Sequence, residues 1–219
     1  MDVLLSTAYL PPVEYFAAMA QADSVHVEAH EHYRKQSYRN RCVLLNVSGV
    51  LELSVPVSKT LPNHCPVRDM RIAYRESWQR NHWKSLETSY STSPYFLYYR
   101  DYLEPFYLSH KYAFLLDFNM ELTQTICRLL RLSVPLLPTV AYEARPDGLA
   151  DLRERIHPKR RAEADYPFRV VEPYTQVFSD KHAFVPNLSI VDLLCSQGPD
   201  SLAYLRRCCA SSVFLQITV

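Results

Sequence analysis

The sequence predicts a mixed α/β fold, in which an N-terminal β-α-β unit and a β-hairpin precede a mostly helical C-terminal half. Three observations favour it. Two short strand-like segments flank a helical one within the first 30 residues, two apolar segments surround a Ser-Gly pair, and apolar residues recur at helical spacing after residue 77. The chain has 219 residues, of which 48% are hydrophobic. We expect a single domain over residues 1–219 that contains a mixed sheet.

The β-α-β unit is predicted to begin with residues 3–6, an apolar run typical of a buried strand. Pro12 suits the first position of a helix, because the N–H that it lacks would have no partner there. The helix is expected over residues 13–22, and a polar pair ends it. Residues 25–28 then alternate as a strand does, and the helical connection allows the two strands to be parallel.

A β-hairpin is the next predicted element. Residues 42–47 and 50–57 are rich in apolar side chains, and Gly49 lies in the turn between them. We expect one more strand at residues 70–73.

Helices dominate the prediction after residue 77. The expected segments are helices at 77–90, 93–106, 119–132, 190–196 and 199–209, and a final strand at 213–219. The most amphipathic of them is 119–132. Residues 143–170 mix charges with prolines and show little apolar period, so they are predicted to form a long basic loop or lid.

Composition argues against several classes of protein. Three glycines cannot supply a Gly-rich phosphate loop, and a net charge of +1 gives no reason to expect a nucleic-acid partner. No window of about 18 apolar residues predicts a membrane span. The first residues do not resemble a signal peptide, and the six cysteines form no C-x-x-C pair, so we expect reduced thiols and a cytoplasmic protein.

Residues 30–41 are the most informative segment, with two histidines, a lysine, three arginines and two tyrosines. A packed core rarely holds so many charges, so we expect a polar wall that binds a small anionic ligand, either planar or sugar-like. Arginine offers a planar fork to phosphate or carboxylate, and lysine a point charge. The alternative is a solvated basic loop that pairs with Glu28 or Glu31. The substrate-binding residues predicted here are Tyr33, Lys35, Arg39, Asn40 and Arg41, with Asn40 expected to fix the backbone.

The helix at 77–90 carries a second candidate set. Trp78 and His82 share one face, because they are four residues apart. Trp78 would stack on a sugar, His82 would accept a proton as a general base, and Tyr90 would shape the neighbouring surface. The alternative is that Trp78 belongs to the core and His82 forms a hydrogen bond with a loop.

Asn187, Ser189 and Asp192 form a third set. Asn187 or Ser189 can cap a helix, and an acid in the first turn suits the helix dipole. The start of a helix also binds anions, so these residues are candidates for completing a substrate pocket.

Glu28, His30 and His32 alternate along the chain and would share one face of an extended strand. Two imidazoles and a carboxylate can bind iron or zinc. The alternative is a solvated strand edge, and we expect no metal site otherwise.

Several segments in sequence order resemble the WbqC-like protein family across nearly the whole chain. They are Tyr9-Leu10-Pro11-Pro12, Tyr33-Arg34-Lys35, Arg39-Asn40-Arg41, His82-Trp83-Lys84-Ser85, Pro94-Tyr95-Phe96 and Pro186-Asn187-Leu188-Ser189. The chain differs from the commoner family pattern at two places. Thr7-Ala8 replaces a Gln-Pro pair, and residues 29–32 (Ala-His-Glu-His) replace an acidic-acidic-x-Gln segment.

The resemblance implies a bacterial protein of surface-polysaccharide biosynthesis that modifies a sugar, by joining an aminoacyl or acyl group to it. We expect a transferase whose anionic substrate is a nucleotide-sugar or an activated acyl donor. The cofactor and the oligomeric state are left open. The alternative is a non-catalytic binding or scaffold protein of the same pathway. For the enzyme, the basic segment 30–41 and the helix at 77–90 should face one hollow.

Overall fold

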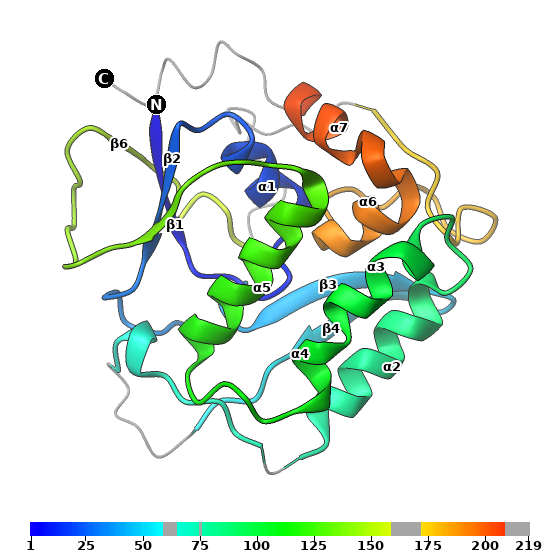
Figure 1. Cartoon of the computed structure of the whole chain (residues 1–219), viewed down its shortest axis with the longest axis horizontal. Coiled ribbons are helices and arrows are strands. Elements are labelled where there is room, and N and C mark those ends of the chain that lie inside the picture. The colour runs from blue at the N-terminus through cyan, green and yellow to red at the C-terminus, as the bar shows by residue number, and fades with distance from the viewer. Residues whose placement is uncertain (59–64, 75, 159–171, 209–219) are drawn as a thin grey trace.

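The N-terminal β-α-β unit is present in the computed structural model, which describes residues 1–58, 65–74, 76–158 and 172–208 (Figure 1). Strand β1 (Asp2–Ser6) leads to helix α1 (Val13–Met19) and strand β2 (Ser24–Glu28). The two strands are parallel, with Asp2 opposite Ser24 and Ser6 opposite Glu28. The predicted unit is therefore confirmed.

Two short strands complete a four-stranded parallel sheet. Strand β5 (Leu136–Pro138) pairs with β2, and β6 (Leu149–Asp151) pairs with β1, which gives the order β5-β2-β1-β6. The sequence did not predict either strand. Each has three residues, β5 ends in a proline, and β6 lies inside the segment predicted to be a loop. Such short runs carry no readable period, and their pairing is decided by distant partners.

The sheet has two different faces. Val3, Leu5, Val25 and Val27 point into the hydrophobic core with Phe16 of α1. The intervening residues of β1 and β2 face the other way, towards residues 139–148, which we call the strap. The strap connects β5 to β6. The core thus covers one face, and the strap, which bends at several residues, lies over the other.

The predicted hairpin is present as β3 (Arg41–Asn46) and β4 (Gly49–Ser54), which pair antiparallel. Gly49 has a φ of 113°, a value that residues other than glycine rarely adopt. The predicted strand at 70–73 is wrong. A 3₁₀ helix, η1 (Val67–Asp69), precedes isolated bridges from Arg71 and Ile72 to two different segments, so no ladder forms.

The predicted helices are present, but their ends differ and one of them is divided. The helices are α2 (Trp78–Tyr90), α3 (Phe96–Leu103), α4 (Pro105–Leu108), α5 (Leu115–Leu130), α6 (Ile190–Gln197), the 3₁₀ helix η2 (Gly198–Asp200) and α7 (Ser201–Arg207). The single helix expected at 93–106 is divided before Pro105, which has no N–H for a continuing helix. The strand expected at 213–219 lies outside the described residues.

One hydrophobic cluster joins the sheet, the hairpin and the helices. The segment before α6 ties these parts together through its backbone, since Ser189 donates to Val43 of β3 and Ile190 donates to Pro11. Figure 1 shows β1, β2 and β6 on one side of the molecule and α2, α3 and α4 on the other. Within the described ranges, the structure contains no helix whose length and apolar character would let it cross a membrane.

Candidate functional site

Buried charged side chains gather where the parallel strands end. Glu28 is the last residue of β2, Asp151 is the last of β6, and Arg153 follows two residues later. Glu28 is 1% exposed and Arg153 is 5% exposed. Ligands of open α/β sheets bind beyond the carboxyl ends of the strands, and charged groups are rarely buried unless they are paired. This edge of the sheet is therefore the candidate site.

Arg153 joins three segments at this edge. Its guanidinium donates to Glu28 at 2.8 Å, to Asp151 at 2.6 Å and to the carbonyl oxygen of Glu143 at 2.9 Å. It also lies 5.1 Å from the centre of the Tyr142 ring. Burial acts to lower the pKa of Arg153, but the hydrogen bonds and charges of Asp151 and Glu28 outweigh it and raise that pKa. The guanidinium is therefore held charged and fixes the strap to both strands.

Glu28 fixes the beginning of the strap, in addition to its ion pair with Arg153. One carboxylate oxygen accepts hydrogen bonds from the Thr139 hydroxyl at 2.8 Å and from the His30 backbone at 2.9 Å, and the other accepts from Arg153. The Thr139 backbone donates to Val27 at 2.9 Å. The buried Glu28 carboxylate thus positions both the beginning of the strap and the segment that follows β2.

A second buried ion pair lies beside the first. Arg39 donates to both carboxylate oxygens of Glu31, at 2.8 and 2.5 Å, and to the Ser6 hydroxyl at 2.9 Å. Asn119 donates to the Arg39 carbonyl oxygen at 2.8 Å and to Thr7 at 3.1 Å. These contacts fix the end of β1 against the segment that carries Arg39.

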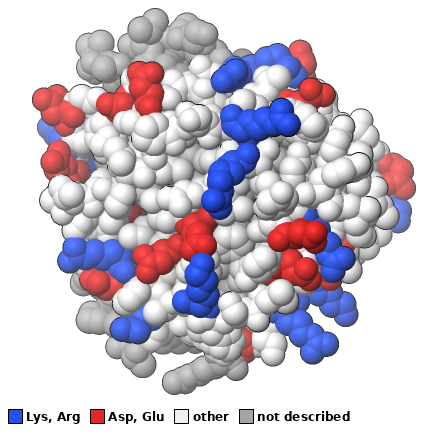
Figure 2. All heavy atoms as spheres, viewed as in Figure 1, with Lys and Arg blue, Asp and Glu red and all other residues white. Residues whose placement is uncertain are grey.

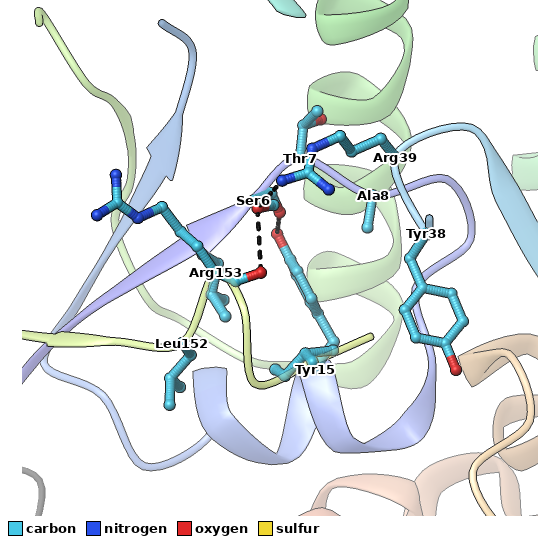
Figure 3. Close-up of a pocket in the computed structure, with 10 residues that line it drawn as sticks. Ser6, Thr7, Ala8, Tyr15, Tyr38, Arg39, Leu152 and Arg153 are labelled. Atoms are coloured by element: carbon cyan, nitrogen blue, oxygen red, sulfur yellow. Dashed lines mark hydrogen bonds between the residues drawn. The ribbon is translucent and has the colours of Figure 1, made fainter. Parts of the chain in front are cut away.

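A small cavity lies at the end of β1, and Figure 3 shows the residues around it. Ser6 stands between the Arg39 side chain and the backbone of Arg153, while the Arg153 guanidinium points away from it. The Tyr15 hydroxyl donates to the Ser6 carbonyl oxygen at 3.0 Å. The cavity volume of about 10 Å³ has room for roughly one water molecule. This cavity can hold a solvent molecule but not a substrate.

A larger hollow opens next to it, and we call it the carboxyl-edge hollow. Its volume is about 330 Å³, which lies within the range of small-molecule sites. The lining residues are His30, Glu31, His32, Arg34, Tyr142, Ala144, Asp151, Arg153 and Glu154. Two arginines face three carboxylates, so the hollow is highly polar without being basic. Such a lining offers both donors and acceptors, as a hydroxyl-rich ligand requires.

Charges on the outer surface are mixed in the same way. Figure 2 shows lysine and arginine side chains interleaved with aspartate and glutamate on the viewed face of the described residues. At the rim of the hollow, the Arg34–Glu154 pair is exposed, with 2.7 Å between its atoms. Arg34 can therefore leave Glu154 at little cost.

The structure gives partners to most of the predicted basic residues. Arg39 pairs with Glu31, as the alternative expected, but the pair is buried and does not belong to a solvated loop. Lys35 is exposed. Burial raises the pKa of Tyr33 to about 12, and the nearby charges of Arg39 and Arg41 partly oppose it. Of this set, Arg39 lines the small cavity, and none lines the carboxyl-edge hollow.

The hairpin positions the other two residues of that set. Asn40 donates to the Val55 carbonyl oxygen at 2.8 Å, so it fixes the backbone as expected. Arg41 pairs with Glu52 across the hairpin at 2.7 Å. Their contact with a substrate stays a prediction.

Helix α2 buries its candidate residues in the core. Trp78 is 3% exposed, His82 is 5% exposed and Tyr90 is fully buried. His82 Nδ1 forms a hydrogen bond with the Tyr9 hydroxyl at 2.9 Å. Burial lowers the pKa of His82 to about 4, against a smaller opposing effect of the Ser54 backbone. The geometry favours the core alternative, because the carboxyl-edge hollow has no α2 residue in its lining and the expected shared hollow does not form there.

The third predicted set acts mainly in capping and burial. Ser189 accepts a hydrogen bond from the Val191 backbone at the start of α6. Asn187 accepts one from the Glu14 backbone and so caps α1 rather than its own helix. Asp192 is 1% exposed. Burial raises its pKa, although hydrogen bonds from residues such as Tyr174 and Gln176 partly oppose this.

The alternative metal set does not assemble. Glu28 is engaged by Arg153, Thr139 and the His30 backbone, and His30 Nδ1 lies 3.0 Å from Arg68. In the part of the chain that the structure describes, no three histidine, cysteine or acidic side chains are placed to hold one metal ion. His30 and His32 instead line the carboxyl-edge hollow.

Sequence reasoning missed Arg153, Asp151, Tyr142 and Ser6 as site residues. The Arg153 side chain meets Glu28 across 125 residues, and no local pattern indicates that pairing. One available signal was the position of the two departures from the family pattern. Thr7-Ala8 directly follows β1, and residues 29–32 directly follow β2. Both departures therefore fall at this edge of the sheet.

Comparison with known proteins gives a family and one relative. A family model described as the WbqC-like protein family matches residues 7–165, a range that includes every lining residue of the carboxyl-edge hollow. The chain is 27% identical to an uncharacterized protein of Mycobacterium tuberculosis, Rv1507c, over 94% of this chain and 97% of that protein. No solved structure matches the chain.

Proposed function

The chain belongs to the WbqC-like protein family, and on that premise we propose that it is a transferase that modifies a sugar during the biosynthesis of a bacterial surface polysaccharide. Its sugar site is the carboxyl-edge hollow. The group transferred to the sugar is an aminoacyl or acyl group, as the family resemblance implies.

The observation that carries the proposal is the network of buried ion pairs behind the hollow. Burying paired charges seldom stabilises a fold more than apolar side chains of the same size would. Two such pairs, Glu28–Arg153 and Glu31–Arg39, meet at the carboxyl ends of parallel strands. Rigid placement of polar groups beside a hollow is what ligand recognition requires.

The chemistry of the lining supports a sugar ligand. The carboxylates of Glu31, Asp151 and Glu154 can accept hydrogen bonds from hydroxyl groups, and Arg34 can donate them. The Tyr142 ring, 53% exposed, offers a surface against which a sugar can pack. An anionic donor would place its phosphates at the rim, near the exposed Arg34 and the following Lys35, rather than at Arg39 or Arg41.

The proton acceptor belongs at the same place. His30 and His32 line the hollow, and imidazole is the commonest general base in enzymes. We therefore assign this role to one of these histidines in preference to His82, which lies in the core.

Binding measurements test the proposal directly. The full-length protein is titrated calorimetrically with UDP-glucose, UDP-N-acetylglucosamine and dTDP-rhamnose, and the tightest ligand is repeated with Tyr142→Ala and with Tyr98→Ala. Tyr98 is an exposed tyrosine of α3 and serves as the control. We expect at least tenfold weaker binding for the first variant only. Equal effects, or no binding by any of the three, would refute the sugar site.

A scaffold role is the second candidate, and one surface favours it. Helices α3 and α4 expose Leu97, Tyr98, Tyr102 and Leu108 by 58% or more. A group of exposed large apolar side chains often marks a protein interface. In that case the titration would show no sugar binding, and Tyr98→Ala would instead release a pathway partner.

A further inference from the structure

A second hollow lies on the other side of the strap, over the free face of the sheet. This sheet-face hollow has a volume of about 570 Å³. Its lining residues are Asp2, Leu4, His26, Glu28, Leu137, Pro138, Thr139, Val140, Ala141, Glu143, Pro146, Asp147, Gly148 and Leu149. Leu4 lies at the base of this hollow, since it lines the hollow, is 2% exposed and stands outside the main core cluster.

The strap divides the two hollows. Ala141 and Glu143 line the sheet-face hollow, whereas Tyr142 and Ala144 line the carboxyl-edge hollow. The side chains of residues 141–144 thus alternate between the two hollows, and this segment forms a partition one chain thick. Arg153 pins this partition through the Glu143 carbonyl oxygen. Two separate compartments thus share one wall.

The two compartments differ in chemistry. The sheet-face hollow has an apolar surface from Leu4, Leu137 and Leu149, and no lysine or arginine occurs among its described lining residues. Glu28 is paired with Arg153, which it shares with Asp151, and His26 adds an imidazole to the lining. Three further carboxylates, those of Asp2, Glu143 and Asp147, give the lining an excess of negative charge. Phosphate and carboxylate groups are repelled there, whereas an ammonium group is attracted.

We propose that the sheet-face hollow binds an organic amine with an apolar body, as a second ligand beside the sugar. The inference goes beyond the proposed function, because it adds a ligand site that is separate from the sugar site and supplies no group for the transfer. It names the chemical class of this second ligand and assigns the strap as the wall between the two sites. Compounds that carry phosphate or carboxylate should bind this compartment more weakly than amines of the same apolar body.

Two alanines of the strap provide a matched test. Ala141 and Ala144 are both exposed and lie on opposite sides of the partition, so Trp at either position should leave the fold intact. The probes are hexylammonium and hexanoate, which share an apolar chain and differ in charge. Binding to the full-length protein is measured by NMR titration, and the nucleotide-sugar is titrated in parallel.

We expect hexylammonium to bind at least tenfold more tightly than hexanoate. A141W should weaken hexylammonium binding at least tenfold and leave sugar binding unchanged, and A144W should do the reverse. Glu143→Gln combined with Asp147→Asn should reduce the preference for the cation. Equal binding of the two probes, or loss of hexylammonium binding in A144W but not in A141W, would overturn the inference. If no nucleotide-sugar binds while hexylammonium binds the parent protein and the variants as expected, only the sugar site is refuted.

Discussion

The buried Glu28–Arg153 pair leads to a quantitative prediction. The two side chains are 1% and 5% exposed and lie 2.8 Å apart. Replacing Glu28 by Ala leaves a buried guanidinium with one carboxylate fewer and also frees Thr139 and the His30 backbone. Breaking a buried pair in this way costs about 3–5 kcal/mol of unfolding free energy.

The exposed Arg34–Glu154 pair is the matched control. Its separation is 2.7 Å, but its side chains are 57% and 53% exposed. Exposed pairs contribute about 0–1 kcal/mol, so Glu154→Ala should be nearly neutral. For a chain of this size each kcal/mol corresponds to about 2–4 °C in the melting temperature. We therefore expect Glu28→Ala to melt roughly 6–20 °C lower and Glu154→Ala within about 4 °C of the parent protein.

Urea unfolding at pH 7 measures both variants. Glu28→Ala combined with Arg153→Met should recover part of the loss, because the pair is then removed together rather than broken. If Glu28→Ala costs less than about 1 kcal/mol, or no more than Glu154→Ala, then the buried pair does not organise this edge of the sheet.

Three further predictions concern protonation and binding. The pKa of His82 is lowered to about 4 in the fold, below its usual 6.5. The unfolded chain therefore binds more protons than the folded protein between these pH values, so the free energy of unfolding falls as the pH falls from 6.5 to 4. His82→Asn should flatten this dependence, measured by urea unfolding at a series of pH values. An unchanged slope would contradict the lowered pKa. The pKa of Asp192 is raised above 3.8 by burial, so its contribution declines as the pH rises above that value. The free energy of unfolding of Asp192→Asn should rise relative to that of the parent protein as the pH is raised from acidic to neutral. A relative fall would contradict the raised pKa of Asp192. Tyr142→Ala should lower the melting temperature by less than about 2 °C, because surface substitutions cost little, yet it should abolish the shift that a bound nucleotide-sugar produces.

The elements that could be predicted from the sequence are those with a local period. The β-α-β unit and the hairpin follow from runs of apolar residues and from Gly49, all within short spans. Strands β5 and β6 could not be predicted, because three residues pair only after the neighbouring strands have formed. The sheet order therefore depends on contacts over more than 100 residues.

The site was predictable in its residue types but not in its partners. Arg39 suggested an anion site, yet Glu31, eight residues earlier, occupies its guanidinium. His82 stands one turn after Trp78, and this spacing suits an apolar core face as well as a ligand surface. The side chains that organise the candidate site, Glu28 and Arg153, lie far apart in the sequence.

Hydrogen exchange measured by mass spectrometry tests the central claim most directly. The full-length protein is compared with and without a saturating amount of the nucleotide-sugar that binds most tightly. The account predicts protection of backbone amides at residues 28–34 and 139–154, with α2 and α3 unchanged. Protection confined to α3 and α4, with no change at the strap, would contradict a sugar site at the carboxyl edge of the sheet.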